Sequence, residues 1–140
     1  MEFLLYLNSH GKQLIHDLIS AKFHIHENIG FCQNNVSFGY TVLPNKFVIC
    51  TKNIKRQGYD PYFYINETVY HEAVHAAQIC KGSALGLSVK QTPLTPDKLQ
   101  NVRDSINATK NYSSEHEERE SYYLEDKPKQ VRYYVRKFCF

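Results

Sequence analysis

The chain has 140 residues, a net charge of +3 and an aromatic content of 14%, all of it Tyr and Phe. This length fits one domain with a single hydrophobic core, and nothing in the composition indicates disorder or repeats. The net charge is too small to indicate a polyanionic partner by itself. Four cysteines without a CxxC pair predict neither a zinc ribbon nor a disulfide framework, and they favour a reducing, intracellular setting. We therefore expect a single domain over residues 1–140.

The N-terminal third alternates between helical and extended patterns. The opening run MEFLLYL is short, lacks a basic leader and a small-residue cleavage site, and is expected to join the core rather than to act as a signal peptide. Leu14, Ile15, Leu18 and Ile19 recur at helical spacing and predict a helix over 9–21. No stretch approaches the roughly 18 apolar residues of a transmembrane span, so we expect no membrane partner.

Three strands are predicted next, over 23–28, 31–43 and 46–51, with a tight turn at Pro44-Asn45 between the last two. Three short strands cannot bury both faces of a sheet alone. The helix over 9–21 and a second helix over 61–81 are expected to cover this small sheet.

The second helix has clear end signals, because Asp60-Pro61 supplies an N-cap and a first helical residue, and Gly82 supplies a left-handed stop. Its apolar stripe consists of Ile65, Val69, Ala73, Ala76 and Cys80, in which Cys80 is read as a small core hydrophobe. The neighbouring face carries Thr68, Glu72, His75 and Ile79, with His71 alongside. This pattern predicts a motif at the edge of the core, open to a cleft.

That motif is HEAVH, from His71 to His75. Histidines four apart share one helix face, so a divalent metal can take one imidazole nitrogen from each, about 2.0–2.1 Å away for zinc. Glu72 then reaches the metal-bound water as a general base, which is hydrolase chemistry. The alternative is an ordinary surface helix rich in His and Glu, which needs no metal.

A third, anionic ligand is expected from a helix further along the chain. The segment 83–96 is predicted to be a loop, Leu99, Val102 and Ile106 predict a helix over 96–107, and Ser114 with Glu117 forms a capping box that opens the next helix. Because the capping box occupies Glu117, Glu118 is the predicted ligand, and Ser121 is small enough to let this helix approach the HEAVH helix. Glu115, His116 and Glu117 remain competing ligands, and a solvated acidic turn remains the alternative to a ligand helix.

The chain ends with a helix after Pro128, whose apolar positions are Val131, Tyr134, Val135 and Phe138. Its other face is basic and includes Tyr133. Such a face can follow a nucleic acid, but five charges on one amphipathic helix usually serve solvation, so nucleic acid is not the expected partner.

HEAVH followed by Glu118-Arg119-Glu120-Ser121 resembles the zincin metallopeptidases of the gluzincin type. The resemblance implies an α+β, zincin-like domain and a zinc-dependent peptidase acting on a peptide or protein substrate. His71, His75 and Glu118 would hold Zn²⁺, Glu72 would be the catalytic base, and Tyr122, Tyr123 or His116 would donate to the oxyanion. The metzincin pattern is missing after His75, and Tyr122 stands where the thermolysin pattern has an Asp, which leaves the partner of the imidazole open. The rival expectation is a non-catalytic binding or structural protein with this fold, for example a subunit of a larger assembly.

Overall fold

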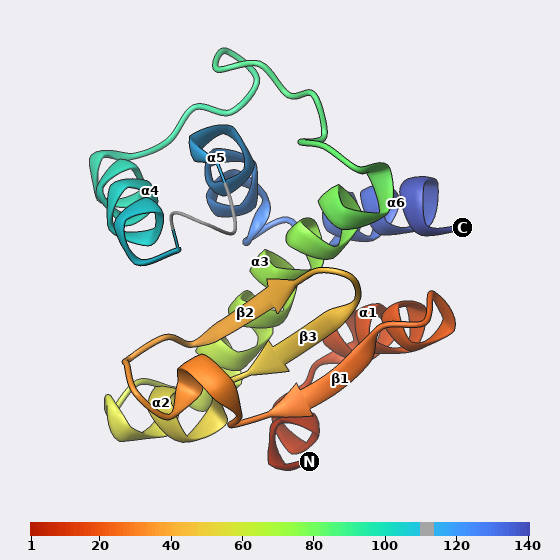
Figure 1. Ribbon diagram of the computed structural model, residues 1–140. Helices are drawn as coiled ribbons and strands as arrows, with labels where there is room; N and C mark the ends of the chain where they lie inside the picture. Colours follow the sequence, from red (N-terminus) through yellow and green to blue (C-terminus); the bar gives the residue numbers. More distant parts are fainter. Residues whose placement is uncertain (110–113) are drawn as a thin grey trace.

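The long helix α3 (Pro61–Lys81) lies at the centre of the fold, and the other elements pack around it (Figure 1). The structure is a computed structural model that describes residues 1–109 and 114–140. Besides α3, its elements are, in chain order, η1 (Glu2–Tyr6), α1 (Ser9–Ser20), β1 (His24–Glu27), η2 (Gly30–Cys32), β2 (Gly39–Val42), β3 (Lys46–Ile49), α2 (Thr51–Arg56), α4 (Pro96–Thr109), α5 (Glu115–Leu124) and α6 (Pro128–Cys139). The α+β class predicted from the sequence is therefore confirmed.

The described strands form one mixed sheet with the order β1-β3-β2. β1 pairs with β3 in parallel, with Ile25 opposite Phe47, and β2 pairs with β3 in antiparallel fashion, with Thr41 opposite Phe47. Figure 1 shows α1 and α3 behind this sheet. The expectation that these two helices cover the sheet is confirmed, and β2 is left as the edge strand nearest to α5.

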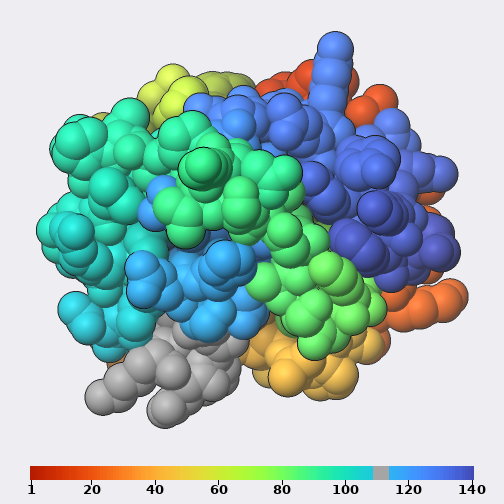
Figure 2. Space-filling view, turned by 90° about the horizontal axis from the view of Figure 1, so that it is seen from above, coloured from red at the N-terminus to blue at the C-terminus, as the bar shows by residue number. Residues whose placement is uncertain are grey.

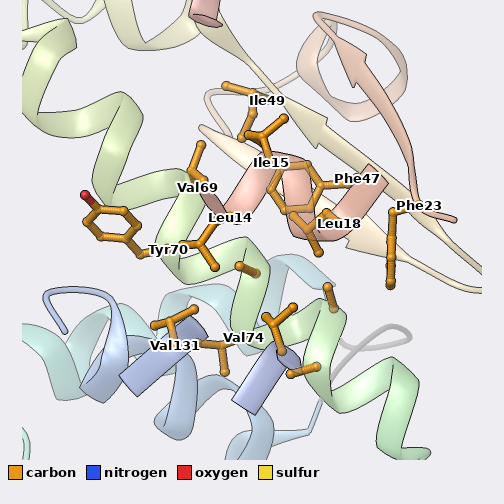
Figure 3. Packing of buried hydrophobic residues seen from close by; sticks show 14 of the residues in the cluster. Leu14, Ile15, Leu18, Phe23, Phe47, Ile49, Val69, Tyr70, Val74 and Val131 are labelled. Atoms are coloured by element: carbon orange, nitrogen blue, oxygen red, sulfur yellow. The ribbon is translucent and has the colours of Figure 1, made fainter. Parts of the chain in front are cut away.

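The core lies between the sheet, α1, α3 and α6 (Figure 3). Leu14 and Leu18 of α1 lie close to Phe47 of β3, Val74 of α3 lies close to Val131 of α6, and all five are fully buried. Phe3 and Leu7 also belong to this cluster, so the opening run contributes to the core as predicted. Burial of this contiguous apolar surface is the main favourable term in the stability of such a domain.

Helix α3 has the predicted bounds and the predicted caps. The Asp60 side chain accepts a hydrogen bond from the amide of Tyr62, and Gly82 adopts a left-handed conformation with φ of 83°. The predicted stripe from Ile65 to Ala76 is fully buried. The expectation of a neighbouring face open to a cleft is wrong, because β2 and α5 pack against that face and bury Thr68, Glu72 and His75 as well.

Two strand predictions were too long. The run 31–43 forms a strand only at Gly39–Val42, and its beginning forms the 3-10 turn η2 instead. The run 46–51 ends as a strand at Ile49, and Thr51 begins the unpredicted helix α2. The Thr51 hydroxyl donates to Glu27 at 2.5 Å, so a contact with β1 helps to hold the residue at this helix start.

The remaining helices follow the predictions with small shifts at their ends. The helix predicted over 9–21 is α1, and the one predicted over 96–107 extends to Thr109 in α4. On the basic face of α6, Arg132 and Arg136 form ion pairs with the buried Asp17 of α1, so part of that charge serves packing between helices. Among the described residues, no helix is long and apolar enough to cross a membrane.

The prediction that the cysteines form no disulfide framework was wrong, because all four cysteines are paired. Cys32 bonds to Cys50, and Cys80 bonds to Cys139, with Cα separations of 5.2 and 5.1 Å that are ordinary for disulfides. Cys80 therefore cross-links the last turns of α3 and α6 and is not a simple core hydrophobe. Because disulfides persist in oxidising environments, the cysteines no longer support a reducing compartment.

Candidate metal centre

Helices α3 and α5 bring two histidines and one glutamate together. One ligand atom each from His71, His75 and Glu118 lies within 4.8 Å of the others. Nε2 of His75 is 3.0 Å from Oε1 of Glu118, and Nε2 of His71 is 3.9 Å from Oε2. Ligand atoms of one tetrahedral zinc ion lie about 3.3 Å apart when each bond is about 2.0–2.1 Å. The three side chains are therefore gathered close to the spacing of ligands that share one metal ion, with His75 and Glu118 slightly closer than that spacing and His71 and Glu118 slightly farther apart.

A small residue, Ser121, lets the two helices approach each other at this point. Ser121 of α5 is fully buried, and its hydroxyl lies 3.2 Å from Nε2 of His75. The expectation that Ser121 permits close packing of the two helices is confirmed. The cap of α5 also follows the prediction, since the Ser114 hydroxyl accepts from the amide of Glu117 and contacts its carboxylate. The capping contact thus turns Glu117 toward Ser114 and leaves Glu118 facing α3.

The imidazole of His71 is oriented by Glu125 at the end of α5. Nδ1 of His71 donates to Oε1 of Glu125 at 2.9 Å, in a buried position. A carboxylate behind a ligating histidine fixes its tautomer and raises its basicity. Burial disfavours the charged ring, but Glu118 and Glu125 outweigh this effect and raise the pKa of His71 well above its ordinary value. Nε2 is thus the nitrogen that faces Glu118.

The imidazole of His75 is oriented by Gln78. The Gln78 amide nitrogen donates to the Glu117 carbonyl and to Glu120, so its oxygen is left to accept from Nδ1 of His75, at 2.8 Å. A neutral His75 would then direct the lone pair of Nε2 at the Glu118 carboxylate. A cation between the two atoms, either a proton or a metal ion, removes that repulsion. Burial lowers the pKa of His75, but the negative charge of Glu118 outweighs this effect and raises that pKa to about 9.

Glu118 carries a buried oxygen without a hydrogen-bond partner. Among the described residues, Oε2 of Glu118 is the buried side-chain atom that lacks one. Burial alone would raise the pKa of Glu118, but the two histidines outweigh it and hold that pKa far below its ordinary value. A buried, charged oxygen without a partner is costly in a folded protein. A metal ion bound between Glu118 and His71 would satisfy it.

The Glu72 side chain points to the sheet side of the centre. Its Oε1 accepts a hydrogen bond of 2.9 Å from the hydroxyl of Thr41 on β2. Gly39 makes this approach possible, because a Cβ at that position would lie 2.9 Å from Thr68 and 3.3 Å from Glu72. Burial raises the pKa of Glu72 above its ordinary value, which suits a group that takes up a proton.

Glu120 ties the segment after α3 to α5. Its carboxylate accepts hydrogen bonds from the amides of Leu85, Gly86 and Leu87, at 2.7 to 3.0 Å. Figure 2 shows this segment, in green, lying against α5 in blue. The two glutamates of the E-x-E-S motif therefore have different roles. Glu118 faces the histidines, and Glu120 fixes the segment after α3.

The alternative metal ligands lie away from the two histidines, and the expected oxyanion donors differ in their distance from the centre. Glu115 and His116 are exposed, which separates them from the buried histidines. Of the expected oxyanion donors, Tyr122 lies nearest to the centre, with its ring centroid 4.5 Å from that of His71 and its hydroxyl 2.6 Å from Ser105. Tyr123 instead lies under Lys127.

Sequence reasoning missed the groups that support the centre, which are Gln78 and Glu125 beside the histidines, Thr41 beside Glu72, and Glu120 on the segment after α3. A signal existed for two of them, since Gln78 follows His75 by three residues and Glu125 follows Glu118 by two helical turns. Thr41 carried no local signal, because its role arises only when β2 packs on α3.

The fold and the centre together define an α+β domain in which two helices present a His, His and Glu set able to share one metal ion. The chain belongs to a family described as a domain of unknown function, DUF8637, whose match covers residues 3–140. No curated protein and no solved structure matches the chain significantly. The family description assigns no activity, so a functional conclusion has to come from the geometry of the centre.

Proposed function

We propose that the protein is a zinc-dependent metallopeptidase with a zincin-like fold. The observation that carries the proposal is the buried Oε2 of Glu118, which lacks a hydrogen-bond partner although its carboxylate lies beside the Nε2 atoms of His71 and His75. The Nδ1 atoms of both histidines are already engaged. Two neutral imidazoles and one carboxylate are a donor set of catalytic zinc sites, which keep a fourth position for water. Zinc fits these donors better than magnesium or calcium, which prefer oxygen ligands.

In this proposal His71, His75 and Glu118 hold the metal, which when bound lowers the pKa of water and polarises a carbonyl group. Glu72 takes a proton from the attacking water and later passes it to the leaving amine. The Thr41 hydroxyl positions Glu72, and Glu125 and Gln78 keep both Nε2 atoms directed at the metal. The edge strand β2, which supplies Thr41, is the element along which a peptide substrate would lie.

The depth of the centre favours a second candidate, a non-catalytic protein in which the metal stabilises the packing of α3 on α5. His71 and His75 are each 9% exposed and Glu118 is 4% exposed. Structural zinc sites are closed, whereas catalytic ones keep an open position. Such a protein would act by binding, for example as a subunit of a larger assembly.

Metal content and hydrolysis separate these candidates. We expect the purified protein to carry zinc in a one-to-one ratio and to cleave an unstructured peptide library, with activity lost on chelation and restored by zinc. Glu72→Gln should keep zinc and lower the cleavage rate by at least about 10²-fold, because the amide cannot accept the proton. Lys90→Gln, at an exposed position of the segment after α3, is the control. Zinc without any cleavage would favour the structural candidate, and a parent without affinity for zinc would refute both.

A further inference from the structure

Exposed apolar side chains gather at the end of the molecule that contains η1 and the start of α3. Leu5 is 79% exposed and Tyr62 is 64% exposed. Together with these two, the exposed side chains Leu4, Tyr59 and Phe63 form what we call the η1/α3 patch. In Figure 1, η1, α2 and the first turn of α3 lie at the lower end of the molecule, away from α5.

Contacts between aromatic rings connect the two parts of the patch. The ring of Tyr6 lies 4.9 Å from that of Tyr62, and the ring of Tyr64 lies within 4.9 Å of those of Tyr59 and Phe63. Asn66 fixes η1 on α3, because its amide nitrogen donates to the Tyr6 carbonyl at 3.0 Å. The exposed side chains therefore project from a rigid base.

A basic helix face adjoins the patch. Lys52, Lys55 and Arg56 of α2 are exposed and, at spacings of three and four residues, lie on one face of the helix. Lys55 forms an ion pair with Glu2 and lies 6.0 Å from the centre of the Tyr6 ring, which joins this face to the patch.

Lys52 and Arg56 of this basic face also line a cavity. This cavity has a volume of about 240 Å³ and is also lined by Asn28 and Gln33. Within residues 1–109 and 114–140, neither Lys52 nor Arg56 has an ion pair with a carboxylate. Two cations without an acidic partner at one cavity attract anionic groups such as phosphate esters.

We propose that the η1/α3 patch and the basic face of α2 dock the protein peripherally on an anionic membrane surface. Leu5 and Phe63 would enter the boundary between headgroups and acyl chains, and Tyr59 and Tyr62 would lie at the headgroup level, where tyrosine is enriched. Lys52 and Arg56 would contact the headgroup phosphates. Peripheral docking needs no spanning segment, and the proposal departs here from the sequence-based expectation of no membrane partner.

The composition favours a lipid surface over a protein partner. The centres of protein interfaces are depleted of lysine, whereas lysine beside exposed leucine and aromatic residues is the composition of interfacial membrane anchors. Phe63 precedes His71 by eight residues, about 12 Å along the helix axis. The patch is thus separate from the metal centre, and the proposal stands whether or not the protein is a peptidase.

Vesicle co-sedimentation of the full chain tests the proposal. We expect binding to vesicles of phosphatidylcholine mixed with phosphatidylserine, weaker binding at high salt, and little binding to phosphatidylcholine alone. Leu5→Gln with Phe63→Gln should weaken binding by about tenfold or more, because both apolar anchors are lost. Leu43→Gln with Val89→Gln, at exposed apolar positions elsewhere, should leave it unchanged.

A second pair of variants tests the basic face. Lys52→Gln with Arg56→Gln should abolish the preference for phosphatidylserine, and Lys12→Gln with Lys90→Gln, two exposed lysines elsewhere, should retain it. Thermal melts establish that each variant is folded. Absence of binding to either vesicle, or equal losses in test and control pairs, would overturn the proposal. A dimer that the Leu5 and Phe63 changes dissociate, without vesicle binding, would instead identify a protein interface.

Discussion

Nδ1 of His71 donates a hydrogen bond to Oε1 of Glu125 at 2.9 Å, and this buried contact connects the middle of α3 with the residue that follows α5. Glu118 and Glu125 are seven residues apart, so they lie on the same face of one helical segment. One of them faces Nε2 of His71 and the other contacts Nδ1. The same segment thus supplies both the predicted metal ligand and the group that orients a second ligand.

Glu125→Gln should therefore weaken zinc binding without removing a ligand. An amide still accepts from Nδ1 but lacks the charge that raises the basicity of the imidazole, and changes of this kind cost about 10–100-fold in metal affinity. Competition titration with a chromophoric chelator measures the effect. Glu115→Gln, an exposed change on the same helix, is the control. Equal zinc affinities for parent and Glu125→Gln would show that the contact serves packing alone.

Glu118→Ala should lower zinc affinity and Glu117→Ala should lower stability, although the two residues are adjacent. Removing Glu118 should lower zinc affinity by orders of magnitude, because it takes away the anionic ligand. Removing Glu117 should spare zinc and cost about 0.5–1.5 kcal/mol, since only the contact of its carboxylate with the Ser114 hydroxyl is lost. Metal titration and thermal melts on both variants check this. If Glu117→Ala emptied the site, the third ligand would have been assigned one residue too late.

Local signals explain what could be predicted from the sequence. Asp60, Pro61 and Gly82 determine the ends of α3 through their own backbone preferences, so both bounds were predicted correctly. Ser114 and Glu117 set the start of α5 in the same way, and this start indicated Glu118. Such features depend on residues close together in the chain.

Tertiary contacts explain what was missed. Thr41 and Glu72 are 31 residues apart in the sequence, and Cys80 and Cys139 are 59 residues apart. No local sequence pattern therefore predicts either contact. The face of α3 with His75 was expected to be open because a single helix cannot reveal how many partners surround it. Packing by β2 and α5 buried that face, and tertiary context here overrode the amphipathic pattern.

Glu27 should make stability depend on pH in the acid range. Burial acts to raise the pKa of Glu27, but hydrogen bonds from the Thr51 hydroxyl and from the amides of Phe3 and Glu2 outweigh it and lower that pKa below 4.5. A lowered pKa in the folded state contributes stability above the unfolded value, and this contribution is lost as pH falls through the folded value. Urea unfolding of the parent and of Glu27→Gln should therefore differ near neutral pH and converge in acid. A difference that stays constant with pH would contradict this role.

The two disulfides should contribute unequally to stability. In the chain-entropy treatment, a cross-link stabilises by restricting the unfolded chain, and the effect grows with the length of the closed loop. The separation of 59 residues between Cys80 and Cys139 corresponds to about 4 kcal/mol, and the separation of 18 between Cys32 and Cys50 to about 3 kcal/mol. Cys80→Ser with Cys139→Ser should thus lower the free energy of unfolding by about 1 kcal/mol more than Cys32→Ser with Cys50→Ser.

Chemical denaturation of both double variants under non-reducing conditions measures this difference. The parent and both variants should approach a common stability in the presence of a reductant, which serves as the control for effects of the serine side chains. Both partners of each bond are replaced, so no unpaired thiol is left to form new disulfides. If the Cys32 and Cys50 changes had the larger effect, contacts of η2 with β3 in the folded state, rather than restriction of the unfolded chain, would dominate.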